Sequence, residues 1–300
     1  TECQAVYAES KERTACHFCK YCQWYKLGTF TLLRYTKKKN MATLSVVLAT
    51  FNEENNLSDC LDSVKDLADE IAIVDGGSTD KTIEIAKKYG AKVKVTDNPP
   101  IFHINKQKAI DMATKDWVLQ LDADERVTPE LVREIKEKIG NWKLEIGNSR
   151  VSGYWIPRKN WFLGRFLMKG GQFPDYTLRL YKRGKGRLPQ KDVHEQAVVE
   201  GETAYFKNSL IHMADPSFSR YLVRFDRYTS LLAKDLQDKK VGYNPIMAAK
   251  YLCILPVWWF LLTYVRHKGF MDSWQGFVFS FLSSLRFPIG YIKVFKMNEK

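Results

Sequence analysis

The chain has 300 residues, of which 45% are hydrophobic, and this is enough apolar material for one large core or two small ones. A formal net charge of +13 excludes an acidic protein and suits an anionic partner, whether nucleic acid, a membrane surface or a phosphorylated small molecule. Four of the six cysteines lie within the first 22 residues, which is not the distribution of an extracellular disulfide framework, so we expect a reducing compartment.

Residues 1–40 form the first segment and differ from the rest of the chain. They lack a regular apolar period and hold eight Lys or Arg against three acidic residues. Cys16, Cys19 and Cys22 have the Cys-x-x-Cys spacing of zinc ligands, but only Cys3 lies close enough in the sequence to complete a site. We therefore expect an atypical, poorly ordered extension rather than a metal site.

The next segment, residues 41–240, has a regular pattern. Apolar runs of strand length alternate with runs that have helical spacing. The predicted strands are residues 44–49, 71–74, 92–95 and 117–121. Strict alternation predicts an α/β domain with a mostly parallel sheet flanked by helices. Because Gly-x-Gly-x-x-Gly and Gly-x-x-x-x-Gly-Lys-Ser/Thr are both absent, a dinucleotide fingerprint and a Walker-type phosphate loop are excluded.

Three of these strands end in polar turns that carry acids. The turns are Asn52-Glu53-Glu54, Asp75-Gly76-Gly77-Ser78 and Asp122-Ala123-Asp124. Open α/β sheets bind ligands at the carboxyl ends of their strands. Asp122 and Asp124 are two residues apart, so on an extended backbone they share one side and suit Mg²⁺ or Mn²⁺ bound to a phosphate. A solvated acidic turn before a helix is the alternative interpretation.

Other residues near these turns also have two interpretations. Asp75 could accept a hydrogen bond from a nucleobase, or it could cap the helix that follows through Ser78. Gly77 permits a ligand to approach the backbone closely. Lys106 and Lys108 open a predicted helix whose amino end would attract phosphate, or they belong to a solvated helical face.

The stretches 45–54, 75–82 and 121–125 resemble, in order and spacing, the motifs of family 2 glycosyltransferases with the GT-A fold. The resemblance covers about residues 43–235, and residues 177–181 and 193–195 are most similar to the non-processive branch that includes lipopolysaccharide-core β-glucosyltransferases. The donor-binding residues that follow from it are Thr50, Asn52, Glu53, Asp75, Gly77, Lys106, Lys108 and Asp122. Asp122 and Asp124 would bind the Mg²⁺ or Mn²⁺ that bridges the diphosphate.

An inverting transfer requires a carboxylate that takes the proton of the acceptor hydroxyl. The resemblance places this base in a loop well after the Asp-x-Asp motif and favours Glu195 over Asp175, with Asp192 also a candidate. His212 is a candidate third metal ligand, and a histidine satisfied within the core is the alternative. The Gln-x-x-Arg-Trp signature of processive polymerases is absent, so we expect one sugar per acceptor.

The last segment, residues 241–300, is expected to associate with a membrane. Residues 252–265 carry no charge but are shorter than the roughly 20 residues that a span needs. With the aromatic run 274–292 they predict paired hydrophobic helices in the membrane interface, held by aromatic rings and by basic residues. The alternatives are a re-entrant hairpin, a single true span, and packing against the catalytic domain or a second subunit.

Taken together, these features predict an inverting, metal-dependent, non-processive glycosyltransferase. It would move one sugar from a nucleotide-sugar, with UDP-glucose as the guess, to a lipid-linked saccharide in cell-envelope glycan synthesis. We expect it at the cytoplasmic face of the membrane, without a nucleic-acid partner and with its oligomeric state open. The alternatives are a polyprenyl-phosphate glycosyltransferase similar to dolichol-phosphate mannose synthase, which needs no strong base, and a non-catalytic basic protein that binds RNA or a membrane.

Overall fold

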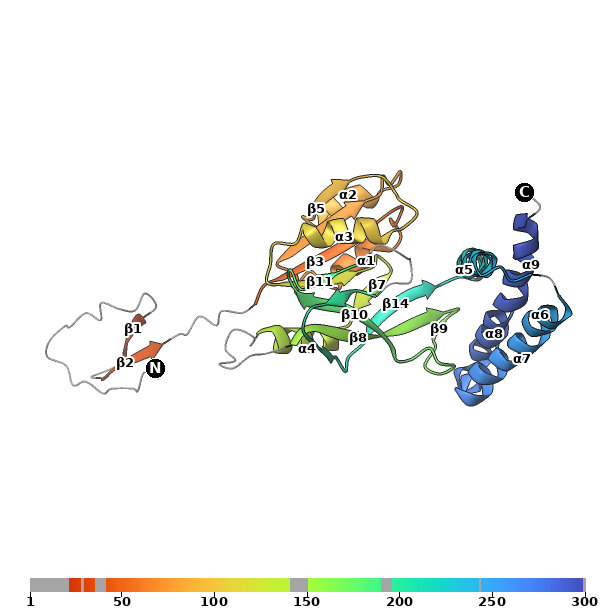
Figure 1. Cartoon of the computed structure of the whole chain (residues 1–300). Helices are drawn as coiled ribbons and strands as arrows, with labels where there is room; N and C mark the ends of the chain where they lie inside the picture. Colours follow the sequence, from red (N-terminus) through yellow and green to blue (C-terminus); the bar gives the residue numbers. More distant parts are fainter. Residues whose placement is uncertain are drawn as a thin grey trace. The chain divides into compact units, whose positions relative to one another are not determined.

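The structure, a computed structural model, describes residues 22–27, 30–35, 42–140, 151–189, 196–242 and 244–298 (Figure 1). The chain forms two compact units, Thr1–Met41 and Ala42–Lys300. In the first unit, strand β1 (Cys22–Leu27) pairs antiparallel with strand β2 (Phe30–Tyr35). Three of the four cysteines of the zinc hypothesis, at positions 3, 16 and 19, lie outside the described residues.

The second unit is built on a ten-stranded sheet, and the first half of this sheet is parallel, which confirms the predicted fold class. The parallel strands lie in the order β5-β4-β3-β6. Their bounds are Leu44–Thr50 for β3, Glu70–Asp75 for β4, Lys92–Val95 for β5 and Trp117–Leu121 for β6. The helices between them are α1 (Leu57–Asp62), α2 (Thr82–Lys88) and α3 (His103–Asp111). Because β4, β3 and β6 are neighbours, their three polar turns meet at one edge.

The second half of the sheet is mixed, and the apolar periodicity does not predict it. The order continues β6-β10-β8-β14-β7, with β10 antiparallel to β6 and β8, and β14 parallel to β8. The bounds are β7 Glu125–Val127, β8 Val151–Phe162, β9 Arg165–Phe166, β10 Asp175–Lys182, β13 Glu202–Tyr205 and β14 Leu210–Asp215. Strands β9 and β13 also pair with β8, and β11 (Gly186–Arg187) pairs with β12 (Val198–Val199). Side chains from β8, β10 and β14 thereby reach the polar edge.

Side chains of the parallel strands alternate between two hydrophobic cores, one on each face of the sheet. Val46 and Leu48 of β3 pack with α1, α2 and α4 (Pro129–Gly140). Val47 of the same strand packs with α3. A strand buried on both faces requires a continuous apolar run, and this is the sequence of β3. The apolar residues of the strands are buried in these two cores, and polar groups lie at the carboxyl ends of the strands.

The chain after the sheet is helical. Helix α5 (Phe218–Asp238) is amphipathic and packs against α9 (Arg286–Asn298). Helices α6 (Pro245–Ala249) and α7 (Leu255–Phe260) join through π-helical turns at Lys250–Ile254 and Leu261–Arg266 into one helix. A 3₁₀ turn (Gly269–Asp272) then leads into α8 (Ser273–Ser284). The break between α8 and α9 falls beside the Arg286-Phe287-Pro288 interruption seen in the sequence.

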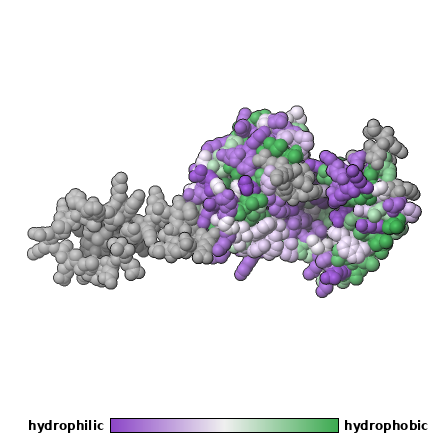
Figure 2. Space-filling view, in the orientation of Figure 1, coloured by the Kyte–Doolittle hydropathy of each residue, from purple (hydrophilic) through white to green (hydrophobic). Residues whose placement is uncertain are grey.

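Apolar side chains of these last helices face outward. Figure 2 shows hydrophobic residues gathered over the C-terminal helices, and Trp258 and Trp274 are 53% and 59% exposed. Two segments, Pro245–Arg266 and Gly269–Phe295, are long and apolar enough to cross a membrane by length and composition. The first has 22 residues, so it is longer than the uncharged run on which the sequence prediction rests.

Candidate functional site

The candidate site lies where β3, β4 and β6 end beside one another. Thr50, the last residue of β3, pairs with Asp75, the last residue of β4. Leu121 ends β6 and is paired with Leu48 of β3, so the Asp122 turn follows directly. The parallel register therefore assembles the three polar turns that the sequence predicts, at the edge where it predicts them.

Asp75 is fully buried, and its carboxylate organises the second turn. Its Oδ1 accepts hydrogen bonds from the backbone N–H groups of Gly77 (3.0 Å) and Ser78 (2.7 Å). Its Oδ2 accepts from the hydroxyls of Thr50 (2.9 Å) and Ser78 (2.6 Å). These four bonds hold the turn in shape, and helix α2, whose N-cap is Lys81, has no side-chain cap. Gly77 has a φ of 83°, a conformation that favours glycine.

The first turn carries Asn52 and Glu53, and local hydrogen bonds hold both side chains. Asn52 has a φ of 54°, and its Oδ1 accepts from the backbone N–H of Thr79 at 2.9 Å, which ties the first turn to the second. The Glu53 carboxylate accepts from Asn56 Nδ2 at 2.8 Å. Burial raises the pKa of Glu53, and the nearby Asp124 carboxylate adds to the rise. The Glu53 carboxyl group therefore lies beside Asp122-Ala123-Asp124, which we call the metal motif.

Asp122 lies between two cationic side chains. Lys106 Nζ forms an ion pair with its Oδ1, and Arg179 Nη2 donates to its Oδ2 at 2.7 Å. Burial raises the pKa of Asp122, but Arg179 and Lys106 outweigh that effect and hold the pKa well below its usual range. Lys108 does not join this group, because its Nζ lies 3.7 Å from Asp97 Oδ1. The two predicted phosphate-binding lysines thus separate, and only Lys106 contacts the motif.

Glu125, which the sequence left without a role, is the centre of a buried ionic network. The residue is completely buried, and its Oε1 accepts from Arg179 Nη2 (2.8 Å) and Arg158 Nη1 (3.3 Å). Arg158 Nη2 also donates to Asp175 Oδ2 at 2.7 Å, and Asn160 Nδ2 donates to the same oxygen at 3.2 Å. The network therefore runs from the metal motif to Asp175, the second candidate base, and anchors its side chain.

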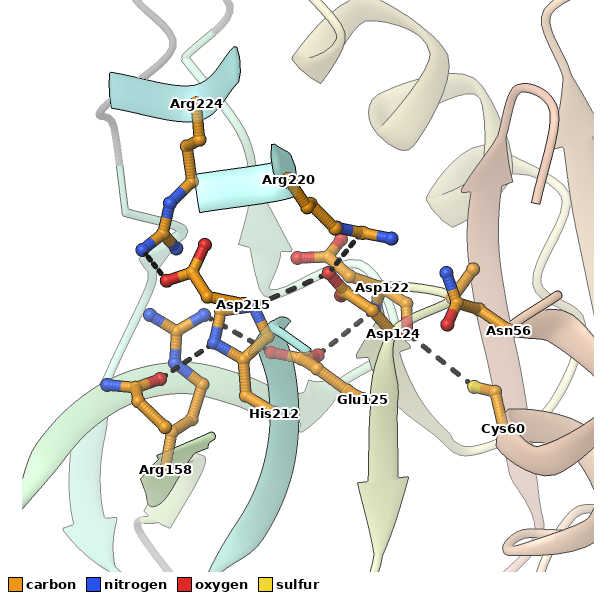
Figure 3. Close-up of polar contacts among 12 residues, drawn as sticks. Asn56, Cys60, Asp122, Asp124, Glu125, Arg158, His212, Asp215, Arg220 and Arg224 are labelled. Atoms are coloured by element: carbon orange, nitrogen blue, oxygen red, sulfur yellow. Dashed lines mark hydrogen bonds and ion pairs between the residues drawn. The ribbon is translucent and has the colours of Figure 1, made fainter. Parts of the chain in front are cut away.

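Asp124 faces a different set of partners, on β14 and α5 (Figure 3). His212 Nε2 lies 3.6 Å from Asp124 Oδ2, and Arg220 Nη2 donates to that oxygen at 3.2 Å. Burial raises the pKa of Asp124, but His212 and Arg220 lower it below its usual range overall. The predicted metal residues Asp124 and His212 are thus brought together, although they lie far apart in the sequence.

The orientation of His212 tests whether these residues fit a metal ion. Asn160 donates its Nδ2 to Asp175, so its Oδ1 faces His212 Nδ1, at 2.7 Å, and accepts that N–H. The charged ring directs its Nε2 proton toward Asp124, which is how His212 lowers the pKa of that carboxyl, whereas the neutral ring leaves a lone pair on Nε2 that can join Asp124 in binding a cation. Within the described ranges, no group of three or more His, Cys, Asp or Glu is assembled as a metal site. The donors are of the kind that Mg²⁺ or Mn²⁺ binds, and each oxygen of Asp122 keeps a lone pair besides the one that faces Lys106 or Arg179.

Several contributors to the site were missed by sequence reasoning. They are Arg158 and Asn160 of β8, Arg179 of β10, Glu125 of β7 and Arg220 of α5. The usable signal was Arg179 itself, a charged residue inside the apolar stretch Thr177–Tyr181, because a buried strand admits a charge only with a partner. Glu195, the favoured base, lies outside the described residues, and so does Asp192.

Comparisons with known proteins show which family the chain resembles. The family model described as Glycosyl transferase family 2 matches residues 45–208. The lipopolysaccharide core biosynthesis glycosyltransferase LpsC of Rhizobium meliloti is 29% identical over 257 residues, which are 81% of this chain and 91% of that protein. An uncharacterized glycosyltransferase of Rickettsia typhi is 28% identical over 271 residues, 86% of this chain and 88% of that protein.

A solved structure also resembles the chain. It is the mannosyltransferase PcManGT from Pyrobaculum calidifontis, in complex with GDP-Man and Mn²⁺, with a TM-score of 0.45 and 12% identity. The match covers 85% of this chain and 88% of that one.

Proposed function

The chain belongs to glycosyl transferase family 2 and is a glycosyltransferase, and from that premise we propose that it moves one sugar from a nucleotide-sugar to a lipid-linked saccharide of the cell envelope. The proposed donor is a UDP-sugar, with glucose as the sugar, and the transfer inverts the configuration at the sugar carbon. The relative LpsC, named for lipopolysaccharide core biosynthesis, supports a core saccharide as the acceptor.

One observation carries this proposal. Asp122 and Asp124 close a buried strand, and three cationic side chains contact them. A nucleoside diphosphate requires both a divalent cation held by carboxylates and positive charge around its phosphates. A protein that only binds RNA or a membrane through basic residues has no need of buried carboxylates at that place, because they would repel phosphate.

Each residue of the site has a part in the proposed transfer. A divalent cation held by Asp122, Asp124 and Nε2 of His212 would neutralise the charge that develops on the departing diphosphate. Lys106 directs a second positive charge at the phosphates from a helix whose amino end also favours anions. Arg179 holds Asp122 in place. These groups are fixed before the donor binds, so little reorganisation is required during transfer.

The proton of the acceptor hydroxyl must pass to a carboxylate on the opposite face of the sugar from the leaving group. We keep Glu195 as the proposed base, on the strength of its sequence context. Asp175, the second candidate, is supported less, because three hydrogen bonds from Arg158 and Asn160 converge on its Oδ2 and fix it within the network.

The proposed place of action is the cytoplasmic face of a membrane. The outward-facing apolar side chains of the C-terminal helices support it, because soluble monomers rarely expose so large an apolar patch. Arg286 stacks on Trp259 at 4.0 Å, and Asp272, Arg286 and Lys293 interrupt the second apolar segment. These charges favour helices that lie in the interface over a pair that spans the bilayer.

The experiment is calorimetric titration of the full chain with UDP in the presence and absence of Mn²⁺. We expect binding that depends on the metal, and Asp124→Ala should weaken it at least about 100-fold, because the variant removes a charged ligand. Asp235→Ala is the matched control, since the exposed Asp235 of α5 pairs with Lys239 and lies outside the site. UDP binding that ignores Mn²⁺, or that survives in Asp124→Ala, would refute the metal-dependent transferase.

A further inference from the structure

A cavity of about 700 Å³ adjoins the metal motif on the Asp124 side. Its walls come from the loop after β3, the start of α1, the β8–β9 hairpin, β14 and the start of α5. Arg220 lines the cavity and donates to Asp124 Oδ2, so cavity and motif share a side chain. The volume lies within the range of about 300–1,000 Å³ that is usual for small-ligand sites.

The donor does not account for this cavity. Three of the residues that the donor is proposed to contact, Thr50, Asp75 and Lys106, are absent from its lining. Only Asn52 and Glu53, at the junction, belong to both places. The cavity is therefore a second compartment next to the reacting end of the donor.

An aromatic wall is the first feature that identifies the occupant. Trp161 and Phe166 are cross-strand partners in the β8–β9 hairpin, with ring centroids 4.7 Å apart in a T-shaped arrangement. The two-residue turn Leu163-Gly164 has φ values of 45° and 90°, which is the hairpin geometry that places partners on one face. Both rings line the cavity and remain partly exposed in it. Flat apolar faces of this kind suit the C–H face of a pyranose ring.

Apart from Ile211, Met213 and Pro216, the rest of the lining is polar and has no net charge. It carries the amides of Asn52, Asn55 and Asn56. The carboxylates of Glu53 and Asp59 balance the guanidiniums of Arg126 and Arg220 there. Amides and balanced charges can both donate to and accept from hydroxyl groups. A wall of this composition fits a neutral, hydroxyl-rich ligand better than a phosphate or an apolar chain.

We propose that this cavity binds the saccharide part of the acceptor, with Trp161 as the stacking platform; the assignment rests on the proposed transferase function. The sugar would lie between the Trp161 ring and the Asn55–Asn56 amides, with its reacting hydroxyl toward the sugar of the bound donor.

The hairpin also contacts the C-terminal helices. Leu163 O accepts from Gln275 Nε2 at 3.3 Å, and Arg165 Nη1 donates to Ser273 Oγ at 3.2 Å. A saccharide whose lipid lies in the membrane interface would therefore enter from the side where the apolar helices lie.

The test measures saccharide binding directly, without catalysis. The probe is core oligosaccharide released from lipopolysaccharide by mild acid, observed by saturation-transfer NMR with the full chain. We expect Trp161→Ala to weaken binding about tenfold and Trp161→Phe to restore most of it, since an aromatic anchor dominates such a site. Asn55→Ala, an exposed change that does not threaten folding, should weaken binding about threefold.

Trp155→Ala is the matched control. Trp155 lies on the same strand and stacks on Tyr205, with centroids 6.1 Å apart, but does not line the cavity. The proposal is overturned if wild type fails to bind the oligosaccharide, if Trp161→Ala and Asn55→Ala bind as wild type does, or if Trp155→Ala loses as much. A UDP and Mn²⁺ titration on the same samples separates the two claims, because its failure alone would refute the transferase and leave the saccharide site standing.

Discussion

The metal-motif edge of the sheet and the C-terminal helices break the usual rule of burial in opposite directions. At the sheet edge, charged side chains are buried: Glu125 is wholly inaccessible, and Arg179 is 7% exposed. In the helix Pro245–Arg266, only 6% of the most apolar stretch is buried inside the protein. The sheet edge buries charged groups that water would solvate, and the C-terminal helices expose apolar groups that water solvates poorly.

The difference lies in where the compensation comes from. Burying an ion costs several kcal/mol, and at the sheet edge the protein offsets this itself by pairing every buried carboxylate with an arginine, a lysine or hydrogen-bond donors. Among the described residues no partner covers the outer faces of the C-terminal helices, and the proposed membrane would supply that cover. Changes in the first region should therefore alter stability, and changes in the second should alter association.

The largest effect is expected for Glu125→Gln, which keeps the shape of the side chain but removes the charge between Arg158 and Arg179. Two buried guanidiniums would lose a shared partner, and we expect a free energy of unfolding about 4 kcal/mol lower. Urea denaturation measures it. Glu130→Gln is the control: Glu130 pairs with Arg133 on the surface and should change stability by less than about 0.5 kcal/mol. Equal effects in the two variants would break the comparison.

Glu70 extends the comparison to the other end of the sheet. Burial raises its pKa, but hydrogen bonds from Lys92, Ser45 and Thr114 outweigh this and lower the pKa to about 2, from 4.5. Because the folded-state pKa is depressed, its stabilisation is complete above about pH 5 and is lost as the pH falls toward 2. We expect the free energy of unfolding of wild type to exceed that of Glu70→Gln by roughly 3 kcal/mol at pH 7.

The measurement is urea denaturation of both proteins at several pH values. The gap between wild type and Glu70→Gln should shrink steadily between pH 5 and the lowest pH at which both still fold. A gap independent of pH would show that the charge of Glu70 is not what stabilises the strand end.

A smaller effect on stability, and a clear one on association, is expected for the double change Trp258→Ser and Trp274→Ser. Both rings are more than half exposed, so the free energy of unfolding should barely change. Partition onto anionic vesicles in sedimentation assays should fall about tenfold, because interfacial anchoring depends on such rings. Trp155→Ser serves as the control, and unchanged partition in the double variant would mean that another surface binds the membrane.

The sequence predicts the two halves of the sheet unequally. The parallel half can be predicted because β3, β4 and β6 are buried on both faces and end in polar turns. Their continuous apolar runs indicate strands, and the turns mark where the strands end. The mixed half is not, because β8 and β10 mix apolar residues with charged ones such as Arg158 and Arg179, and a charge in a strand ordinarily argues against burial. The network pairs these charges through residues distant in the sequence.

Residue type also limits what can be predicted for single side chains. Asp75 suits both a nucleobase contact and a helix cap, since each requires a carboxylate at a strand end, but its four hydrogen bonds in the structure brace the Gly77-Ser78 turn and do not cap α2. Lys106 and Lys108 are alike in sequence, and the helix turns just one of them toward Asp122. Neither distinction follows from periodicity.

The ion-paired residues at the sheet edge are electroneutral as a group. They comprise four carboxylates and four cationic side chains, those of Asp122, Asp124, Glu125, Asp175, Lys106, Arg158, Arg179 and Arg220. A divalent cation entering alone would leave two positive charges without compensation, and a bare diphosphate would leave negative ones. The two cancel most of each other's charge, so the site admits them best as one complex, and each should raise the affinity for the other by the same factor.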